Sequence, residues 1–275
     1  MFYGKNPLSI KCAFDSFSVR KAFLMAKASS LSYKNYNEVK KSCARELRIK
    51  QENIFYTTYR LTQAYVFFKS NEIIVAFRGT EKTKLEDWIA DLKVTTEEIK
   101  IGFAHKGFLG SYKIVSGDVL ARVVPLIKKN TKLFICGHSL GGALAMMCAV
   151  DFFSLGILVS GVYTFGQPRV GKKKFQKNFP KILEKRIHRF ANDKDVVPRV
   201  PPRLIGYRHV GNPRFFTNDG ILHLDKVEWR KFKKRCKQKS KSVIGRLLEL
   251  VATSGEMITD HNMDDYVKLL KKAKF

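Results

Sequence analysis

The stretch from Leu133 to Met147 constrains the fold of this chain more than any other part of the sequence. It reads as a short apolar strand, a sharp turn at Gly137–Gly141 and a helix of small residues. In the turn, Ser139 has a glycine two residues away on each side, in the pattern G-x-S-x-G. Glycine at both positions allows a strained turn that raises the serine hydroxyl above the edge of a sheet. The following helix directs its positive end at that hydroxyl, so the stretch predicts a serine placed to act as a nucleophile.

A G-x-S-x-G turn between a strand and a helix is typical of the nucleophile elbow of α/β-hydrolases. Elsewhere in the chain, apolar stretches of strand length alternate with stretches of helical spacing. This alternation predicts a mostly parallel central sheet with helices on both faces. No linker rich in Gly, Ser or Pro divides the 275 residues. We therefore expect a single domain with the α/β-hydrolase fold over residues 1–275, with a basic C-terminal segment at about residues 226–250.

The expected helices and strands follow from the spacing of apolar residues. Helical segments are predicted over Val19–Tyr33, Asn37–Leu47, Lys84–Leu92, Tyr112–Lys128, Lys172–Leu183 (disturbed by Pro180) and Asp264–Lys274. Strands are predicted over Ile54–Tyr59, Ala64–Phe68, Glu72–Thr80, Gly161–Phe165 and Arg186–Ala191. The continuous apolar run within Glu72–Thr80 indicates a central strand that is buried on both faces. Its end at Gly79 and Thr80 lies at the sheet edge where open α/β sheets bind ligands.

A catalytic serine needs partners, because its hydroxyl is a weak nucleophile until an imidazole accepts its proton. The imidazole needs a carboxylate that fixes its tautomer, and in α/β-hydrolases the chain order is Ser, Asp or Glu, then His. His138 neighbours Ser139, but adjacent side chains in a turn point apart, so we expect a structural role for it. Three later histidines remain candidates for the base, and chain order does not choose among them: His209, His223 and His261.

Six motifs occur in a fixed order along the chain. They are F-R-G-T at Phe77–Thr80, D-W-I-A-D-L at Asp87–Leu92, H-K-G-F at His105–Phe108, G-H-S-L-G-G-A-L-A at Gly137–Ala145, Y-T-F-G-Q-P-R-V-G at Tyr163–Gly171 and D-V-V-P-R-V-P-P at Asp195–Pro202. Together they resemble the class 3 lipases, the family of the fungal triacylglycerol lipases with bacterial and plant relatives. The resemblance covers approximately Val19 to Val210 and becomes thin after Gly211.

The resemblance implies roles for individual residues. The family's nucleophile falls on Ser139, and its oxyanion donors fall on Thr80 and on the backbone N–H of Leu140. The family's acid falls on Asp195, which directly precedes the V-P element, with Asp193 as the near alternative. The family histidine lies on a late loop, which His261 suits best.

Two of those assignments keep an alternative. His223 is the second choice for the base, because the resemblance fails in the segment before His261. His209 follows the P-P element and resembles a structural position. Asp87 and Trp88 belong either to a lid over the site or to a half-buried amphipathic helix, and the sequence favours neither.

By resemblance, the expected function is that of a serine carboxylester hydrolase that releases fatty acids from lipid esters through an acyl-enzyme at Ser139. No metal and no organic cofactor is implied. The resemblance does not decide whether the lipid is a glyceride or a phospholipid. Cleavage of a phospholipid would be a reaction of the phospholipase A1 type. The alternative is a cationic membrane- or nucleic-acid-binding protein on a hydrolase scaffold. Binding alone gives no reason for an elbow serine with an acid and a base, so we favour the enzyme.

The charge of the chain is unusual, since 52 Lys and Arg against 24 Asp and Glu give a net charge of +28. Such a field attracts anionic surfaces. The basic segment interleaves its lysines and arginines with Trp229 and Phe232, a composition suited to a membrane surface. Four residues are the expected membrane contacts: Lys231, Lys233, Lys234 and Arg235. Nucleic acid is disfavoured as a partner, because no supporting module is present. The plainer interpretation of the charge is a basic surface that only faces solvent and binds no partner.

The expected location is cytoplasmic, with peripheral contact to membranes. Five cysteines are odd in number and without metal spacing, which favours a reducing compartment. The first thirty residues contain no apolar segment of the signal-peptide type, and no run of eighteen apolar residues occurs. Export without a cleaved signal is the alternative.

Overall fold

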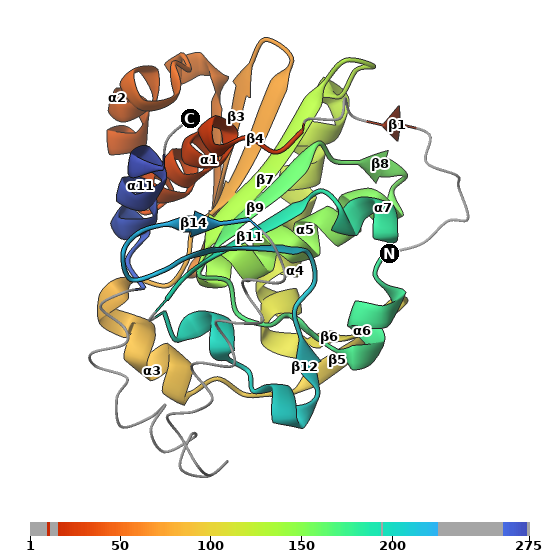
Figure 1. Ribbon diagram of the computed structural model, residues 1–275. Helices are drawn as coiled ribbons and strands as arrows, with labels where there is room; N and C mark the ends of the chain where they lie inside the picture. The colour runs from red at the N-terminus through yellow and green to blue at the C-terminus, as the bar shows by residue number, and fades with distance from the viewer. Residues whose placement is uncertain (1–9, 12–15, 194, 225–260, 274–275) are drawn as a thin grey trace.

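A mixed sheet of eight strands forms the centre of the protein in a computed structural model, which describes residues 10–11, 16–193, 195–224 and 261–273 (Figure 1). The strand order is β14-β13-β11-β9-β7-β4-β3-β2. The strands are β2 (Ile54–Tyr59), β3 (Thr62–Lys69), β4 (Glu72–Phe77), β7 (Lys132–His138), β9 (Gly161–Phe165), β11 (Ile187–Asn192), β13 (Asn212–Phe216) and β14 (Leu222–His223). The neighbours from β4 to β13 pair in parallel, whereas β2, β3 and β14 add antiparallel edges. The predicted mostly parallel sheet is confirmed.

The central strands are apolar along their length because both of their faces are covered. In β4, Ile73 and Val75 belong to one hydrophobic cluster, whereas Ile74 and Ala76 belong to a second cluster on the opposite face. The alternation follows from the two-residue repeat of a strand. The predicted burial of this strand on both faces is therefore confirmed.

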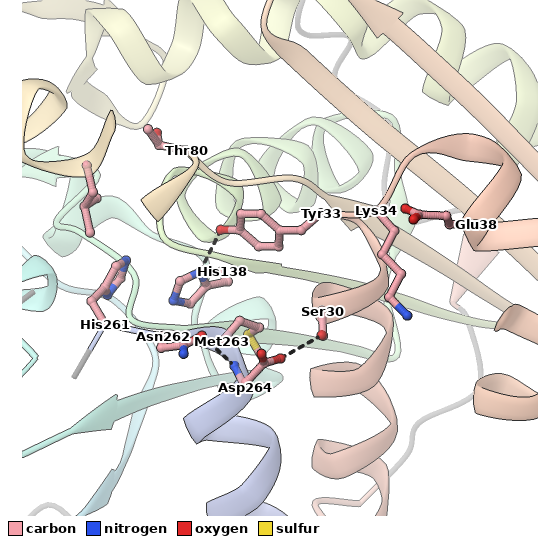
Figure 2. A pocket seen from close by; sticks show the side chains of 11 residues that line it. Ser30, Tyr33, Lys34, Glu38, Thr80, His138, His261, Asn262, Met263 and Asp264 are labelled. Atoms are coloured by element: carbon pink, nitrogen blue, oxygen red, sulfur yellow. Dashed lines mark hydrogen bonds between the residues drawn. The ribbon is translucent and has the colours of Figure 1, made fainter. Parts of the chain in front are cut away.

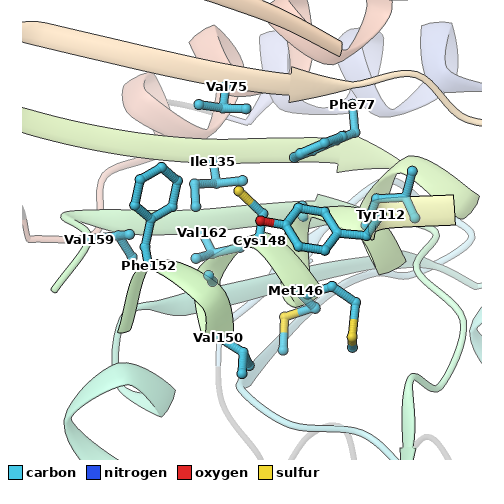
Figure 3. Packing of buried hydrophobic residues seen from close by; sticks show 14 of the residues in the cluster. Val75, Phe77, Tyr112, Ile135, Met146, Cys148, Val150, Phe152, Val159 and Val162 are labelled. Carbon is cyan, nitrogen blue, oxygen red and sulfur yellow. The ribbon is translucent and has the colours of Figure 1, made fainter. Parts of the chain in front are cut away.

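Helices cover the two faces of the sheet. On one face lie α1 (Val19–Leu31), α2 (Tyr36–Leu47) and α11 (Met263–Lys272), and on the other lie α4 (Lys106–Val123) and α5 (Leu140–Ser154) (Figure 1). Figure 3 shows the face that α4 and α5 cover, where Phe152 and Cys148 of α5 lie against Ile135 and Val162 of the sheet. Burying such side chains stabilises the fold by about 1.5–3 kcal/mol each.

The helix before the elbow begins six residues earlier than the sequence predicts. The expected range was Tyr112–Lys128, but α4 begins at Lys106 and ends at Val123, followed by a 3₁₀ turn at Val124–Leu126. Two glycines in the first turns obscure the helical pattern, since glycine is a poor helix former. His105 supplies the missing signal, because its Nδ1 accepts a hydrogen bond from the backbone N–H of Phe108 at 3.3 Å and caps the helix.

Several short elements were not predicted. A second sheet has the order β12-β10-β6-β5 and consists of β5 (Thr96–Ile99), β6 (Gly102–His105), β10 (Gly171–Lys172) and β12 (Tyr207–Arg208). A further pair joins β1 (Ile10–Lys11) to β8 (Ile157–Leu158). Strands of two to four residues carry no recognisable period. The predicted basic helix is divided at Pro180 into α6 (Lys173–Asn178) and α7 (Lys181–Glu184), as the disturbance at that proline predicted.

The predicted membrane contacts Lys231, Lys233, Lys234 and Arg235 lie outside the described residues, as does the rest of the basic segment. Within the described ranges, no helix combines the length and the apolar character needed to cross a membrane. Three cysteines in those ranges are free and buried: Cys43, Cys136 and Cys148.

Candidate active site

Ser139 lies at the junction of β7 and α5 in a strained backbone conformation, with φ 57° and ψ −128°. Such a conformation is costly for a residue other than glycine, by about 1–3 kcal/mol. It is held by a hydrogen bond from the Ser139 N–H to the carbonyl of Phe165 in β9, at 2.9 Å. A Cβ at Gly137 would lie 2.3 Å from the backbone of Gly141, and a Cβ at Gly141 would lie 2.2 Å from the carbonyl oxygen of Phe77. The two glycines of the motif are therefore required by close backbone approach.

Asp195 and His261 form a buried pair. His261 Nδ1 lies 2.8 Å from Asp195 Oδ2 and 2.9 Å from Oδ1, and both side chains are at most 1% exposed. The carboxylate also accepts a hydrogen bond from the backbone N–H of Val197 at 2.9 Å and one from the Tyr266 hydroxyl at 2.6 Å. A buried carboxylate needs such donors to offset its lost hydration. The histidine consequently keeps its Nε2 directed away from the acid.

Two contacts bring His261 to the serine turn. The ring of His138, the residue before Ser139, stacks on the ring of His261 with centroids 4.3 Å apart. A Cβ built at Gly166 would lie 2.5 Å from Cε1 of His261, and Gly166 directly follows the residue whose carbonyl binds the Ser139 N–H. Ser139 Oγ and His261 Nε2 are both buried without a hydrogen-bond partner among the described residues. This leaves one free hydroxyl and one free imidazole nitrogen at the same end of the sheet.

His138 is held as a neutral ring between Tyr33 and His261. Burial, together with the neighbouring His261, lowers the pKa of His138 well below its usual value. Burial raises the pKa of Tyr33, so its hydroxyl stays protonated, and it lies at hydrogen-bond distance, 2.7 Å, from His138 Nδ1. The contacts agree with the structural role that we expect for His138. A neutral ring there also avoids repulsion when His261 takes up a proton.

The alternative acid and bases lie in other surroundings. His223 is on the edge strand β14, where its ring stacks on Phe215 at 4.8 Å. His209 Nε2 lies 2.7 Å from the carbonyl oxygen of Pro198. The backbone carbonyl of Asp193 accepts a hydrogen bond from Arg199 at 3.0 Å. The structure thus brings His261 and Asp195 together near Ser139, and it gives His209 and Asp193 contacts within the surrounding loops.

Leu140 directly follows Ser139, and Thr80 directly follows a glycine that packs against the serine turn. Leu140 is the first residue of α5, and the first N–H groups of a helix have no partner within the helix. Thr80 follows β4 after Gly79, where a Cβ would lie 2.4 Å from the carbonyl oxygen of His138 and 3.1 Å from Cβ of Ser139. The end of β4 therefore passes directly beside the turn. Thr80 is partly exposed and lines a pocket with His138 and His261 (Figure 2).

The segment predicted as a lid or as a half-buried helix forms α3 (Leu85–Ala90). Leu85 is buried against Val196 and Val197, the residues that follow Asp195. Trp88 is half-buried and stacks on Phe108 with centroids 6.1 Å apart. In this structure the segment is a short helix that packs on the loop after Asp195, a position that fits both predicted alternatives, a lid and a half-buried surface helix.

The sequence did not identify Tyr266 or Tyr33 as residues of the site. The sequence places Tyr266 near the start of a predicted helix, shortly after His261. This position does not distinguish it from an aromatic residue that only packs in the core. Tyr33 follows α1, more than a hundred residues before the serine, and only the fold brings it to His138. In the described part of the chain, no group of three or more His, Cys, Asp or Glu residues could hold a metal ion.

Comparison with known proteins gives one family. The family model described as lipase (class 3) matches residues 74–205. A lipase of Rhizomucor miehei is 36% identical over 156 residues, which cover 54% of this chain and 42% of that protein. The phospholipase A1-II 1 of Oryza sativa subsp. indica is 32% identical over 167 residues, which cover 51% of this chain and 42% of that protein. The chain spans less than half the length of these two relatives.

Solved structures extend the likeness over most of the fold. The triacylglyceride lipase of Rhizomucor miehei superposes with a TM-score of 0.65 and 27% identity, covering 76% of this chain and 86% of that chain. A triacylglycerol lipase whose catalytic centre is described as a serine protease triad matches with a TM-score of 0.60 and 27% identity, covering 74% of this chain and 81% of that chain. The predicted α/β-hydrolase fold is confirmed.

Gly166 offers a test of the site geometry. In Gly166→Ala the new Cβ would lie 2.5 Å from Cε1 of His261 and 2.7 Å from Asp195 Oδ2, at a φ of 56°, so the pair must shift. Because a displacement of about 1 Å can cost about 10²-fold in rate, kcat on a soluble p-nitrophenyl ester should fall by about that factor.

The matched control for this variant is Gly206→Ala. Gly206 also has a positive φ, 91°, but the nearest atom to its Cβ is Cδ of Lys172 at 3.3 Å. Circular dichroism and the melting temperature of both variants separate backbone strain from the effect on the site. Equal losses of kcat in the two variants would contradict a special role of Gly166.

Proposed function

The chain belongs to the class 3 lipase family, and from this we propose that it is a serine carboxylester hydrolase acting on lipid esters. One observation carries the proposal. Ser139 Oγ and His261 Nε2 are buried and unpartnered among the described residues, while His261 Nδ1 lies 2.8 Å from Asp195 Oδ2. An imidazole with one nitrogen on a carboxylate and the other free is what a serine nucleophile requires as its base.

The proposed reaction follows from these positions. Ser139 Oγ attacks the ester carbonyl while His261 Nε2 accepts its proton, and Asp195 stabilises the imidazolium. The oxyanion accepts hydrogen bonds from the backbone N–H of Leu140 and from Thr80. His261 then donates the proton to the leaving alcohol, and a water molecule that it activates releases the fatty acid from the acyl-enzyme. The hydrogen bond from Tyr266 keeps the carboxylate oriented throughout.

The three residues should behave as a unit in kinetics. A fluorophosphonate probe should label the wild type at Ser139 and should leave folded Ser139→Ala unlabelled. Asp195→Asn and His261→Ala should each lower kcat by about 10⁴, because a triad member acts only with its partners. The measurements are active-site labelling located by mass spectrometry and steady-state rates on a soluble ester.

The alternative residues supply the controls for this prediction. Asp193→Asn and His223→Ala remove the same chemical groups at positions that we place outside the triad. A loss of about 10⁴ in either of them, with activity kept in Asp195→Asn or His261→Ala, would overturn the assignment. Labelling at another serine would overturn the proposed nucleophile.

Thr80 can be tested by removing only its hydroxyl. Thr80→Val keeps the shape and the backbone amide, so kcat should fall by about 10²–10³ if the hydroxyl donates to the oxyanion. Thr80→Ser retains the hydroxyl and should keep most of the activity. A change in KM with kcat intact in Thr80→Val would assign the residue to substrate binding instead.

We also propose that the enzyme works on anionic membrane surfaces. The net charge of +28 supports this, since each Lys or Arg near an anionic bilayer contributes about 1 kcal/mol. Vesicle binding should weaken steeply between 0.1 M salt, where the Debye length is about 10 Å, and 1 M, where it is about 3 Å. Replacing Lys231, Lys233, Lys234 and Arg235 by Gln should weaken binding in vesicle sedimentation. Unaltered binding of this variant would show that these four charges only face solvent.

A further inference from the structure

The pocket beside His261 has two ends of different chemistry. Its volume is about 330 Å³. At one end lie Thr80 and His261, with Leu85 supplying apolar surface. At the other end, beyond His138 and Tyr33, lie Lys34 and Glu38, as Figure 2 shows. An ester placed at the reacting end therefore extends part of its alcohol moiety toward charged side chains.

Lys34 brings a positive charge to this wall. Its backbone is fixed, because its N–H donates to the carbonyl of Leu31 at 3.0 Å and its carbonyl accepts from the Tyr65 hydroxyl at 3.1 Å. The side chain is partly buried, and its ammonium has no carboxylate within 4 Å among the described residues. At longer range, Lys34 is one of several cations that lower the pKa of Glu46. A partly buried ammonium that no described carboxylate contacts within 4 Å is suited to a phosphate group.

Two carboxylates lie at the same pocket. Asp264 is in the first turn of α11, three residues after His261, and one of its oxygens lies 3.4 Å from the Ser30 hydroxyl. Glu38 accepts a hydrogen bond from the Asn35 N–H through Oε2 at 3.2 Å, which leaves its second oxygen available. Both side chains are exposed, so this end of the pocket is wet. The pocket that contains His261 is thus also lined by one cation and two anions.

This set of charges selects among lipid esters. A glyceride carries no charge, so its glycerol or its further acyl chains gain no electrostatic attraction from these three groups. An anionic head group would meet Lys34 but also two carboxylates. A zwitterionic phospholipid offers a partner to both signs of charge, because its phosphate is joined to the same glycerol as the reacting ester and its ammonium follows two carbons later.

On the basis of the proposed hydrolase function, we propose that the polar end of this pocket binds the head group of a zwitterionic phospholipid, with its phosphate at Lys34 and its ammonium at Asp264 and Glu38. A primary ammonium fits better than a quaternary one. Carboxylates accept hydrogen bonds from a primary ammonium, whereas quaternary ammonium groups are bound by aromatic cages. The substrate class is therefore that of phosphatidylethanolamine, cleaved at an acyl ester.

The test uses short-chain lipids that stay monomeric, so that adsorption to a surface plays no part. Dihexanoyl-phosphatidylethanolamine, dihexanoyl-phosphatidylglycerol and dihexanoylglycerol share their acyl chains and differ in the head group. The readout is kcat/KM on each lipid divided by kcat/KM on p-nitrophenyl butyrate, which has no head group. For the wild type we expect the ratio to be largest for phosphatidylethanolamine and smallest for dihexanoylglycerol.

Charge removal at each position should give a different pattern. Lys34→Gln should lower the ratio about tenfold for both phospholipids and should leave that for dihexanoylglycerol unaltered. Asp264→Asn should lower the ratio for phosphatidylethanolamine several-fold without lowering that for phosphatidylglycerol. Glu38→Gln should act in the same direction as Asp264→Asn, and it keeps the helix cap because glutamine also serves at that position.

The control for the loss of a charge is Lys129→Gln. Lys129 is exposed in the turn before β7, at the end of the sheet opposite Ser139, and its removal should alter none of the ratios. A wild type that prefers dihexanoylglycerol, or ratios that Lys34→Gln leaves unaltered, would overturn the head-group site while the hydrolase function stands. A wild type that hydrolyses none of the four esters would overturn both.

Discussion

The strained backbone at Ser139 is the constraint on which the rest of the site depends. A φ of 57° at a serine persists only where the surroundings determine it from several sides. Here β7 ends directly before Ser139 and α5 begins directly after it. The carbonyl of Phe165 in β9 accepts the hydrogen bond of the Ser139 N–H. The apolar cores on both faces of the sheet hold β7, α5 and β9 together. The packing of helices far from the turn therefore helps to position the Ser139 hydroxyl.

The second constraint is a buried carboxylate. Asp195 is 2% exposed, which is unfavourable for a charge unless donors surround it. Its partners come from different parts of the chain: the next turn supplies the Val197 N–H, and the region of α11 supplies both His261 and Tyr266. The contacts of Asp195 are therefore complete only when the last described helix, α11, has packed against α1 and into the hydrophobic cluster on that face of the sheet.

The sequence predicted what depends on local pattern and missed what depends on distant contacts. The elbow was recognisable because its glycines, strand and helix are contiguous, and the central strand because both of its faces are apolar. The start of α4 was missed because its cap is a histidine and its first turns contain glycines. The strands of the second sheet are too short to show a period. Tyr33 and Tyr266 look like any core aromatic residue, and their hydroxyls gain a role only through contacts across the fold.

The proposed head-group site and the contacts of His261 share one turn of the chain. The turn after α1 carries Tyr33, whose hydroxyl holds His138, and His138 stacks on His261. The next residue, Lys34, lines the other end of the same pocket. The backbone hydrogen bond from Lys34 to Leu31 and the hydrogen bond from Tyr65 fix this turn against the sheet. Because this turn is fixed, a phosphate bound at Lys34 in the proposed complex would stay within one side-chain length of the same backbone position, and the glycerol esters close to that phosphate are the ones that we expect to reach Ser139.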